Sequence, residues 1–214
     1  YSADNKPYTP ARHFQISTDG IKEGDFTMIY GFPGNTQEYI TSDAVEYIAK
    51  LSDPLKIHFR TKRLDIIGAA QAQSPKTRIQ YAAKQANIAN AWKKWQGEVK
   101  GINRLGTYDK KVAYETKFRA ENPEKAYILD SLKAAYERNM EGYFNYELFN
   151  ETLRGIELQQ VVAIAKSEKL SDEQKQAAAE LFYKDFDVNV DRQLAVAMLK
   201  EYEKYSSFIS EELK

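Results

Sequence analysis

The sequence predicts a mostly α-helical fold of about six helices, preceded by a short segment of two β-strands. Three helix starts share one signal, a capping residue followed by proline at the first helical position. A fourth start carries a capping box, in which serine is followed three residues later by glutamine. Between these starts, apolar residues recur at three, four or seven positions, as they do along one face of a packed helix.

The β signals lie in residues 1–40. Residues 14–17 alternate apolar and polar side chains, and residues 26–30 are rich in aromatic and β-branched types. Two strands alone are marginally stable in water, so we expect them to belong to a sheet whose other strands are absent from this chain. A Pro-Gly turn at residues 33–34 follows, and its loop matches neither glycine-rich phosphate-binding pattern. We expect a helical domain, residues 41–214, after it.

The helical part begins at Thr41-Ser42-Asp43. The starts with proline at the first helical position are Asp53-Pro54, Ser74-Pro75 and Asn122-Pro123. The helix from Pro123 carries an aromatic patch over residues 143–149 and continues toward Ile156, with Gly142 and Gly155 as candidate bends. The last two helices are expected over residues 171–184, after the capping box, and 188–206, after Asp187 or Asn189.

The helix predicted from Pro75 to about Leu105 has two distinct faces. One face is a seam of large apolar residues at heptad spacing, formed by Tyr81, Ile88, Trp95 and Ile102 with Trp92 and Val99 between them. The other face carries small residues and one amide: Ala83, Ala86, Asn90, Gly97 and Gly101. Asn is a poor helix former, so Asn90 either makes an inter-helix hydrogen bond or presents its amide to a bound group such as an ammonium.

Composition excludes several function classes. The chain has 31 basic and 31 acidic residues, so no basic excess argues for nucleic acid, and no apolar run is long enough to span a membrane. It has no cysteine, which excludes disulfides, thiolate metal sites and a cysteine nucleophile. Its two histidines, His13 and His58, have no metal-ligand spacing, and we interpret them as partly exposed or hydrogen-bonded. We interpret the basic run at residues 60–63 as a solvated helix face.

Several stretches resemble the S46 family of bacterial dipeptidyl aminopeptidases. Near the start they are residues 1–5, 12–17 and 26–36. In the third helix they are Tyr81-Ala82-Ala83-Lys84 and Asn90-Ala91-Trp92-Lys93, followed by Gly97. The resemblance extends over all 214 residues and is loosest after residue 140.

The resemblance implies a serine exopeptidase that removes dipeptides from the N-termini of peptides. Enzymes of this family have a chymotrypsin-like double β-barrel, with a large helical domain inserted between the barrels that caps the active site. Residues 1–40 would then be closing strands of the first barrel, and residues 41–214 the helical cap. The implied partner is the peptide substrate, no cofactor or metal is implied, and a periplasmic or secreted location is expected.

The resemblance also implies that the catalytic triad lies outside this chain. The family's catalytic His and Asp lie upstream of Tyr1, which we interpret as the start of an excised piece, and its nucleophilic Ser lies downstream of Lys214. His13 belongs to a different motif. The chain alone is therefore expected to be inactive. One substrate-binding residue is included, because the cap-domain asparagine that helps hold the substrate's free α-amino group falls on Asn90.

From the residues alone, a second function stays open. This is a non-catalytic helical interaction module, in which residues 143–149 line a partner-binding groove. The sequence does not show which residue the enzyme prefers before the scissile bond. It also leaves open whether the full enzyme is a homodimer. Without partner strands, we expect residues 1–40 to be the least well packed part, or to pair with another copy through open strand edges.

Overall fold

A computed structural model gives the fold over residues 6–28, 31, 34–35 and 37–205. Its contacts divide the chain into two units, Tyr1–Glu38 and Tyr39–Lys214, and each is described by itself.

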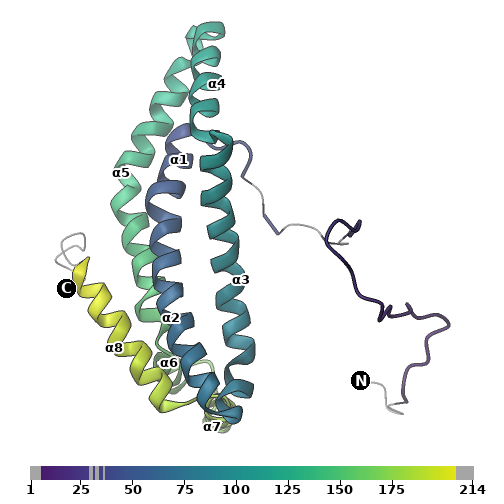
Figure 1. The fold of residues 1–214 in the computed structure, drawn as a ribbon. Coiled ribbons are helices and arrows are strands. Elements are labelled where there is room, and N and C mark those ends of the chain that lie inside the picture. Colours follow the sequence, from purple (N-terminus) through teal and green to yellow (C-terminus); the bar gives the residue numbers. More distant parts are fainter. Residues whose placement is uncertain (1–5, 29–30, 32–33, 36, 206–214) are drawn as a thin grey trace. The chain divides into compact units, whose positions relative to one another are not determined.

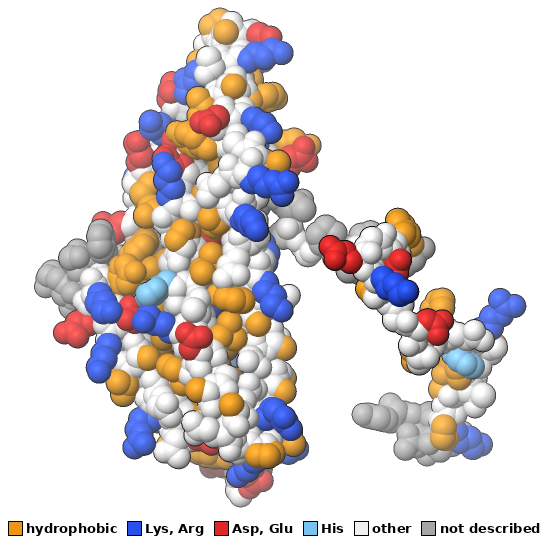
Figure 2. Space-filling view, in the orientation of Figure 1, with side chains coloured by type: hydrophobic (Ala, Val, Ile, Leu, Met, Phe, Trp, Pro, Cys, Tyr) orange, Lys and Arg blue, Asp and Glu red, His pale blue; other side chains and the backbone are white. Residues whose placement is uncertain are grey.

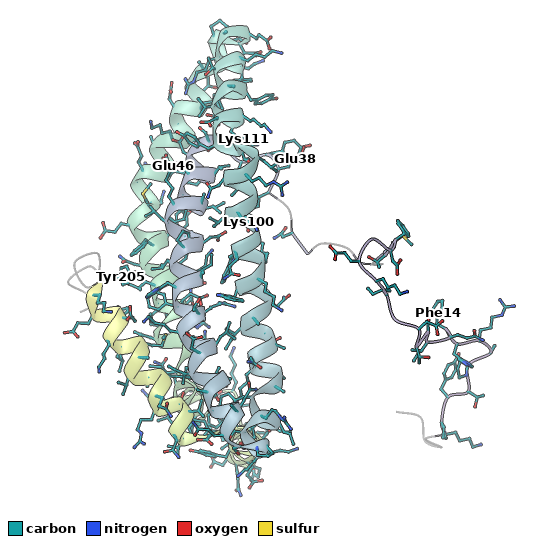
Figure 3. The ribbon with its side chains drawn as sticks, in the orientation of Figure 1. Phe14, Glu38, Glu46, Lys100, Lys111 and Tyr205 are labelled. Atoms are coloured by element: carbon teal, nitrogen blue, oxygen red, sulfur yellow. The ribbon has the colours of Figure 1, made fainter. Side chains whose placement is uncertain are left out.

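The described residues of the first unit form neither helix nor strand. The strand expected over residues 14–17 is not formed, and residues 26–28 of the second expected strand are unpaired. The remaining residues of that strand, 29–30, and Pro33 of the expected turn lie outside the described residues. Figure 3 shows Phe14, whose side chain is 99% exposed. A strand is stabilised by hydrogen bonds to a neighbouring strand, and the described part of this unit supplies none.

The described part of the second unit contains eight α-helices, which confirms a mostly α-helical fold (Figure 1). They are α1 (Ser42–Tyr47), α2 (Asp53–Gln73), α3 (Pro75–Leu105), α4 (Thr107–Glu121), α5 (Ala126–Glu151), α6 (Leu158–Lys166), α7 (Asp172–Lys184) and α8 (Val188–Lys204). The long helices α3 and α5 both pack on α2, and α8 packs on α2 as well. The central helix of the unit is therefore α2.

The start expected at Asp53-Pro54 coincides with the first residues of α2, but Asp53 does not cap the helix, because the backbone is already helical there. α1 passes into a π-helix, η1 (Ile48–Ser52), which passes into α2 with helical dihedral angles at Asp53 (φ −68°, ψ −42°). Proline inside an α-helix removes one hydrogen bond and clashes with the carbonyl four residues before it. The wider π turn before Pro54 relieves that conflict, so the helix continues instead of restarting.

The starts at Ser74-Pro75, Ser171 and Asp187 are confirmed, whereas the α-helix expected from Pro123 begins three residues later. The Ser74 side chain accepts a hydrogen bond from the Thr77 amide at 3.2 Å and begins α3, which has the predicted bounds. Ser171 forms the capping box of α7, and the Asp187 carboxylate caps α8. Pro123 begins a short 3-10 turn, η2 (Pro123–Lys125), that leads into α5.

Two helices, α4 and α6, were not predicted from the sequence. Gly106 takes a left-handed conformation (φ 59°) that ends α3, and α4 begins at the next residue. Gly142 does not interrupt α5. The chain breaks only after Glu151, in the 3-10 turn η3 (Leu153–Gly155), and α6 follows that turn.

The core consists of two clusters spaced along α2. One contains Leu55 and Phe59 of α2 with Leu148 of α5 and Met198 of α8. Tyr205, at the end of α8 in Figure 3, closes this cluster, with its ring centroid 5.9 Å from that of Phe59. The second cluster joins α2, α3 and α8 through Ile67, Tyr81, Ile88, Val190 and Leu194. The helices around α2 are thus fixed by burial of apolar side chains.

The visible face of the helical unit carries interspersed basic and acidic side chains with apolar ones between them (Figure 2). Among the described residues, no helix is both long and apolar enough to cross a membrane.

Candidate functional site

Asn90 lies on the outward face of α3. Its side chain is exposed, and so are those of Ala83, Ala86 and the backbone at Gly97 on the same face. An added Cβ at Gly97 or Gly101 would meet no atom within 4 Å, so the surface beside Asn90 is open. Within the described residues Asn90 makes no inter-helix hydrogen bond. The inter-helix hydrogen bond, one of the two interpretations from the sequence, is therefore not formed in the described part of the chain.

The opposite face of α3 is held tightly to α2, directly behind Asn90. Arg60 Nη1 donates a hydrogen bond to the carbonyl oxygen of Ile88 at 3.3 Å. Trp92 Nε1 donates to Thr61 Oγ1 at 2.9 Å. Because these two anchors flank Asn90 by two residues on each side, the backbone that carries the amide is fixed on both sides.

Arg60 also connects α2 to α5. Its Nε and Nη2 donate to the two carboxylate oxygens of Glu151 at 2.9 and 2.8 Å, in the paired geometry that suits a guanidinium. Its guanidinium lies over the Trp95 ring, with Cζ 4.4 Å from the ring centroid, and Lys56 lies over the same ring at 4.5 Å. Three helices thus meet at one charged group behind the α3 surface.

A second polar cluster surrounds the π-helix. Glu147 of α5 accepts hydrogen bonds from Ser52 Oγ at 2.6 Å and from the Tyr47 hydroxyl at 2.9 Å. Burial, and then the charge of Glu147, raise the pKa of Tyr47. Burial also raises the pKa of Asp53, partly offset by Lys56 at 3.0 Å. The cluster joins α1, η1 and α2 to α5, and Asp53 Oδ2 is buried without a hydrogen-bond partner.

His58 is hydrogen-bonded, one of the two forms expected from the sequence. Its Nε2 lies 2.9 Å from Glu201 Oε2 of α8. Burial alone would raise the pKa of Glu201, but hydrogen bonds from Lys204, His58 and Lys62 outweigh it and lower that pKa to about 2. His13 lies in the first unit and is exposed. Across the described ranges, no group of three or more candidate ligands could hold a metal ion.

The interpretation of residues 60–63 as a solvated face is wrong. Arg60 is paired with Glu151, and most of the Arg63 side chain is buried. The reason is that α2 is covered by α3, α5 and α8, so even its basic residues lie at packed surfaces. The sequence also gave no signal for a cavity beside Arg63, because its walls come from α3, η3, α6, α7 and α8 as well as α2.

The aromatic patch over residues 143–149 is divided by the helix. Phe144 and Leu148 pack in the core, whereas Tyr143, Tyr146 and Phe149 are 53%, 64% and 42% exposed. This narrows the expected groove to a strip of three side chains on α5.

Comparison with known proteins agrees with this architecture. The chain is 32% identical to an Asp/Glu-specific dipeptidyl-peptidase of Flavobacterium psychrophilum, over 94% of this chain and 31% of that protein. It is also 32% identical to dipeptidyl-peptidase 7 of Phocaeicola vulgatus, over the same shares of the two chains. A crystal structure of Porphyromonas endodontalis DPP11 in complex with the dipeptide Arg-Glu matches with a TM-score of 0.72 and 29% identity, covering 95% of this chain and 32% of that one.

The chain therefore spans about a third of the length of these relatives. The family model for peptidase S46 matches residues 1–210. The chain belongs to the peptidase S46 family.

Proposed function

We propose that this chain is the helical cap, with a remnant of the first β-barrel, of a serine dipeptidyl aminopeptidase that releases dipeptides from peptide N-termini. Its family and the names of its relatives support the substrate class. A neighbour solved with a bound dipeptide supports it further. In this proposal the catalytic His, Asp and Ser are supplied by the rest of the enzyme, and the cap closes over the active site and excludes water.

The exposed side chains of the first unit support the barrel remnant. Phe14 and Ile16 are 99% and 90% exposed, and Phe26 and Met28 are 89% and 63% exposed. Each pair is two residues apart, so in an extended strand both members would lie on one face. We propose that in the longer enzyme these segments pair with barrel strands and turn these side chains inward.

The proposed role of Asn90 is to anchor the free α-amino group of the substrate. The observation that carries this role is an exposed amide on an open face of α3, with its helix fixed to α2 on both sides. The amide oxygen can accept a charge-assisted hydrogen bond from an ammonium, typically worth about 1.5–3 kcal/mol. An exopeptidase needs such a contact because the free amine distinguishes a chain end from an internal peptide.

The test is Asn90→Ala in the full-length enzyme. Losing one charge-assisted hydrogen bond should lower kcat/KM for a chromogenic dipeptide by about 10- to 150-fold. The preference for a free amine over an N-acylated substrate should narrow by a similar factor. Asn103→Ala is the matched control, because Asn103 is also exposed on α3 but lies roughly 140° around the helix axis. Unchanged kinetics in Asn90→Ala, or an equal loss in Asn103→Ala, would remove the anchor role.

A periplasmic or secreted location belongs to the same proposal. It predicts a signal peptide at the start of the complete reading frame. Relatives named as Asp/Glu-specific and as dipeptidyl-peptidase 7 both match, so the proposal does not extend to the residue preferred before the scissile bond.

The alternative is a non-catalytic interaction module, and the exposed strip of Tyr143, Tyr146 and Phe149 on α5 favours it. The complete reading frame separates the two. A His and an Asp upstream with a serine nucleophile motif downstream support the peptidase, and their absence supports the module. If the peptidase is correct, alanine at Tyr146 leaves kcat/KM unchanged.

A further inference from the structure

A cavity of about 400 Å³ lies within the helical unit, and Asn90 is not part of its lining. Its walls come from α2, α3, η3, α6, α7 and α8. One part of the lining is charged, with three basic residues, Arg63, Lys84 and Arg154, and two acidic ones, Glu157 and Asp185. Another part is apolar, with Ile67, Ile88 and Phe182. A cavity with both kinds of wall suits a ligand that has a charged end and an apolar body.

Arg63 is the unusual member of this lining. Its guanidinium lies against the backbone of Gly155, where an added Cβ would be only 3.2 Å from Cζ. Its Nε is buried and has no hydrogen-bond partner. Burial lowers the pKa of Arg63, with the charge of Glu151 partly offsetting it. A guanidinium held in this way is a cation with donors to spare.

Three carboxylates near Arg63 are engaged by other groups, and a fourth, Asp185, lines the cavity. Glu151 is paired with Arg60 through both of its oxygens. Glu157 is paired with Lys84. Asp191 accepts hydrogen bonds from the backbone amides of Glu157 and Leu158 at 2.7 and 3.1 Å, which caps the start of α6. No carboxylate hydrogen-bonds to Arg63 in the described part of the chain.

We propose that this cavity is a binding site for a small carboxylate with an apolar body, and that Arg63 is the residue that binds the carboxylate. The amide side chains of Asn87 and Gln160 also line the cavity and can donate further hydrogen bonds to it. The wall that includes Ile67, Ile88 and Phe182 receives the apolar body. Phosphate has no apolar part, so it would contact the charged residues of the lining and not the apolar wall. The proposal stands whether or not Asn90 anchors substrate, because Asn90 does not line the cavity.

The experiment is an isothermal titration calorimetry measurement, in which the full-length protein is titrated with N-acetyl-leucine. N-acetyl-leucine has a carboxylate and an apolar body but lacks the free amine of a dipeptidyl-peptidase substrate. N-acetyl-leucinamide, its uncharged counterpart, and inorganic phosphate are the comparison ligands. We expect N-acetyl-leucine to bind more tightly than either. Arg63→Gln should raise its Kd by about tenfold or more, because a charge-assisted bond is lost.

Arg78→Gln is the matched control, because it removes the same charge from an exposed position on α3. It should leave the Kd unchanged. Should Arg63→Gln fail to fold, Asn87→Leu at an exposed rim position provides the second variant, and it should also weaken binding. Absence of binding, equal binding by Arg63→Gln, or binding of the uncharged amide as tight as that of the acid would each overturn the proposal. So would phosphate binding as tightly as N-acetyl-leucine.

Discussion

The charged pair that joins α2 to α5 gives a quantitative prediction. Arg60 and Glu151 have side chains that are only 19% and 7% exposed, and both oxygens of Glu151 are bound by Arg60. Replacing one partner of such a pair leaves the other charge buried and uncompensated, which typically costs about 3–5 kcal/mol. We therefore expect Glu151→Leu to lower the free energy of unfolding by about this amount.

The second half of the prediction concerns the double variant. Arg60→Met with Glu151→Leu removes both charges and keeps apolar side chains of similar length. Because neither buried charge remains, the double variant should lose far less stability than the sum of the two single changes, and should lie within about 2 kcal/mol of the wild type. Urea denaturation followed by far-ultraviolet circular dichroism measures all four proteins of this cycle.

A matched pair on the surface provides the control. Arg119 and Asp130 lie 2.8 Å apart, the same separation as Arg60 and Glu151, but their side chains are 39% and 67% exposed. Solvent screens an exposed pair, so Asp130→Leu should have little effect. Additive losses in the Arg60 and Glu151 cycle would refute the reasoning, because additivity means that the two charges do not depend on each other.

Three further predictions concern pH, glycine positions and activity. The pKa of Glu201 is about 2 in the folded protein against an ordinary value of 4.5, so its ion pairs stabilise the fold above pH 4.5 and are lost as pH falls toward 2. The difference in Tm between wild type and Glu201→Gln should therefore shrink over that interval, and a constant difference would contradict it. Gly142→Ala, in α5 with no atom within 4 Å of the added Cβ, should stabilise by about 0.5–1 kcal/mol. Gly155→Ala should destabilise by about 1 kcal/mol or more, because its Cβ would press on the buried Arg63; denaturation midpoints of the two variants that move in the same direction would refute this contrast. The 214-residue chain alone should release no dipeptide from a chromogenic substrate. Measurable release would contradict the proposal that the catalytic residues lie outside this chain.

Local chemistry predicted most of the helices. Ser74, Ser171 and Asp187 accept backbone hydrogen bonds within three residues, so the signal and its partner lie in one short stretch of sequence. Asp53-Pro54 carries the same signal, yet the π turn before it lets the helix continue. That outcome depends on packing of α1 and α2 against other helices, which the local pattern does not contain.

The candidate site was predictable only where it depends on local spacing along one helix. Helical spacing placed Asn90 on the face opposite Tyr81 and Ile88, and its exposure agrees with that spacing. The spacing could not reveal that Arg60 and Thr61 hold α3 from behind. Arg63 was misjudged because its burial depends on Gly155, which lies far along the sequence. The segments near Phe14 and Phe26 carry a strand pattern in the sequence, but they form no strand because no described segment pairs with them.

The uninterrupted backbone from α1 through η1 to α2 has a mechanical consequence. Ser42, at its first residue, donates hydrogen bonds from both its backbone amide and its hydroxyl to Glu115 of α4, each at 2.6 Å. A force applied to the chain just before Ser42 is therefore shared between two helices from the outset. Since α2 is packed against α3, α5 and α8, we expect this force to be transmitted to those three helices as well.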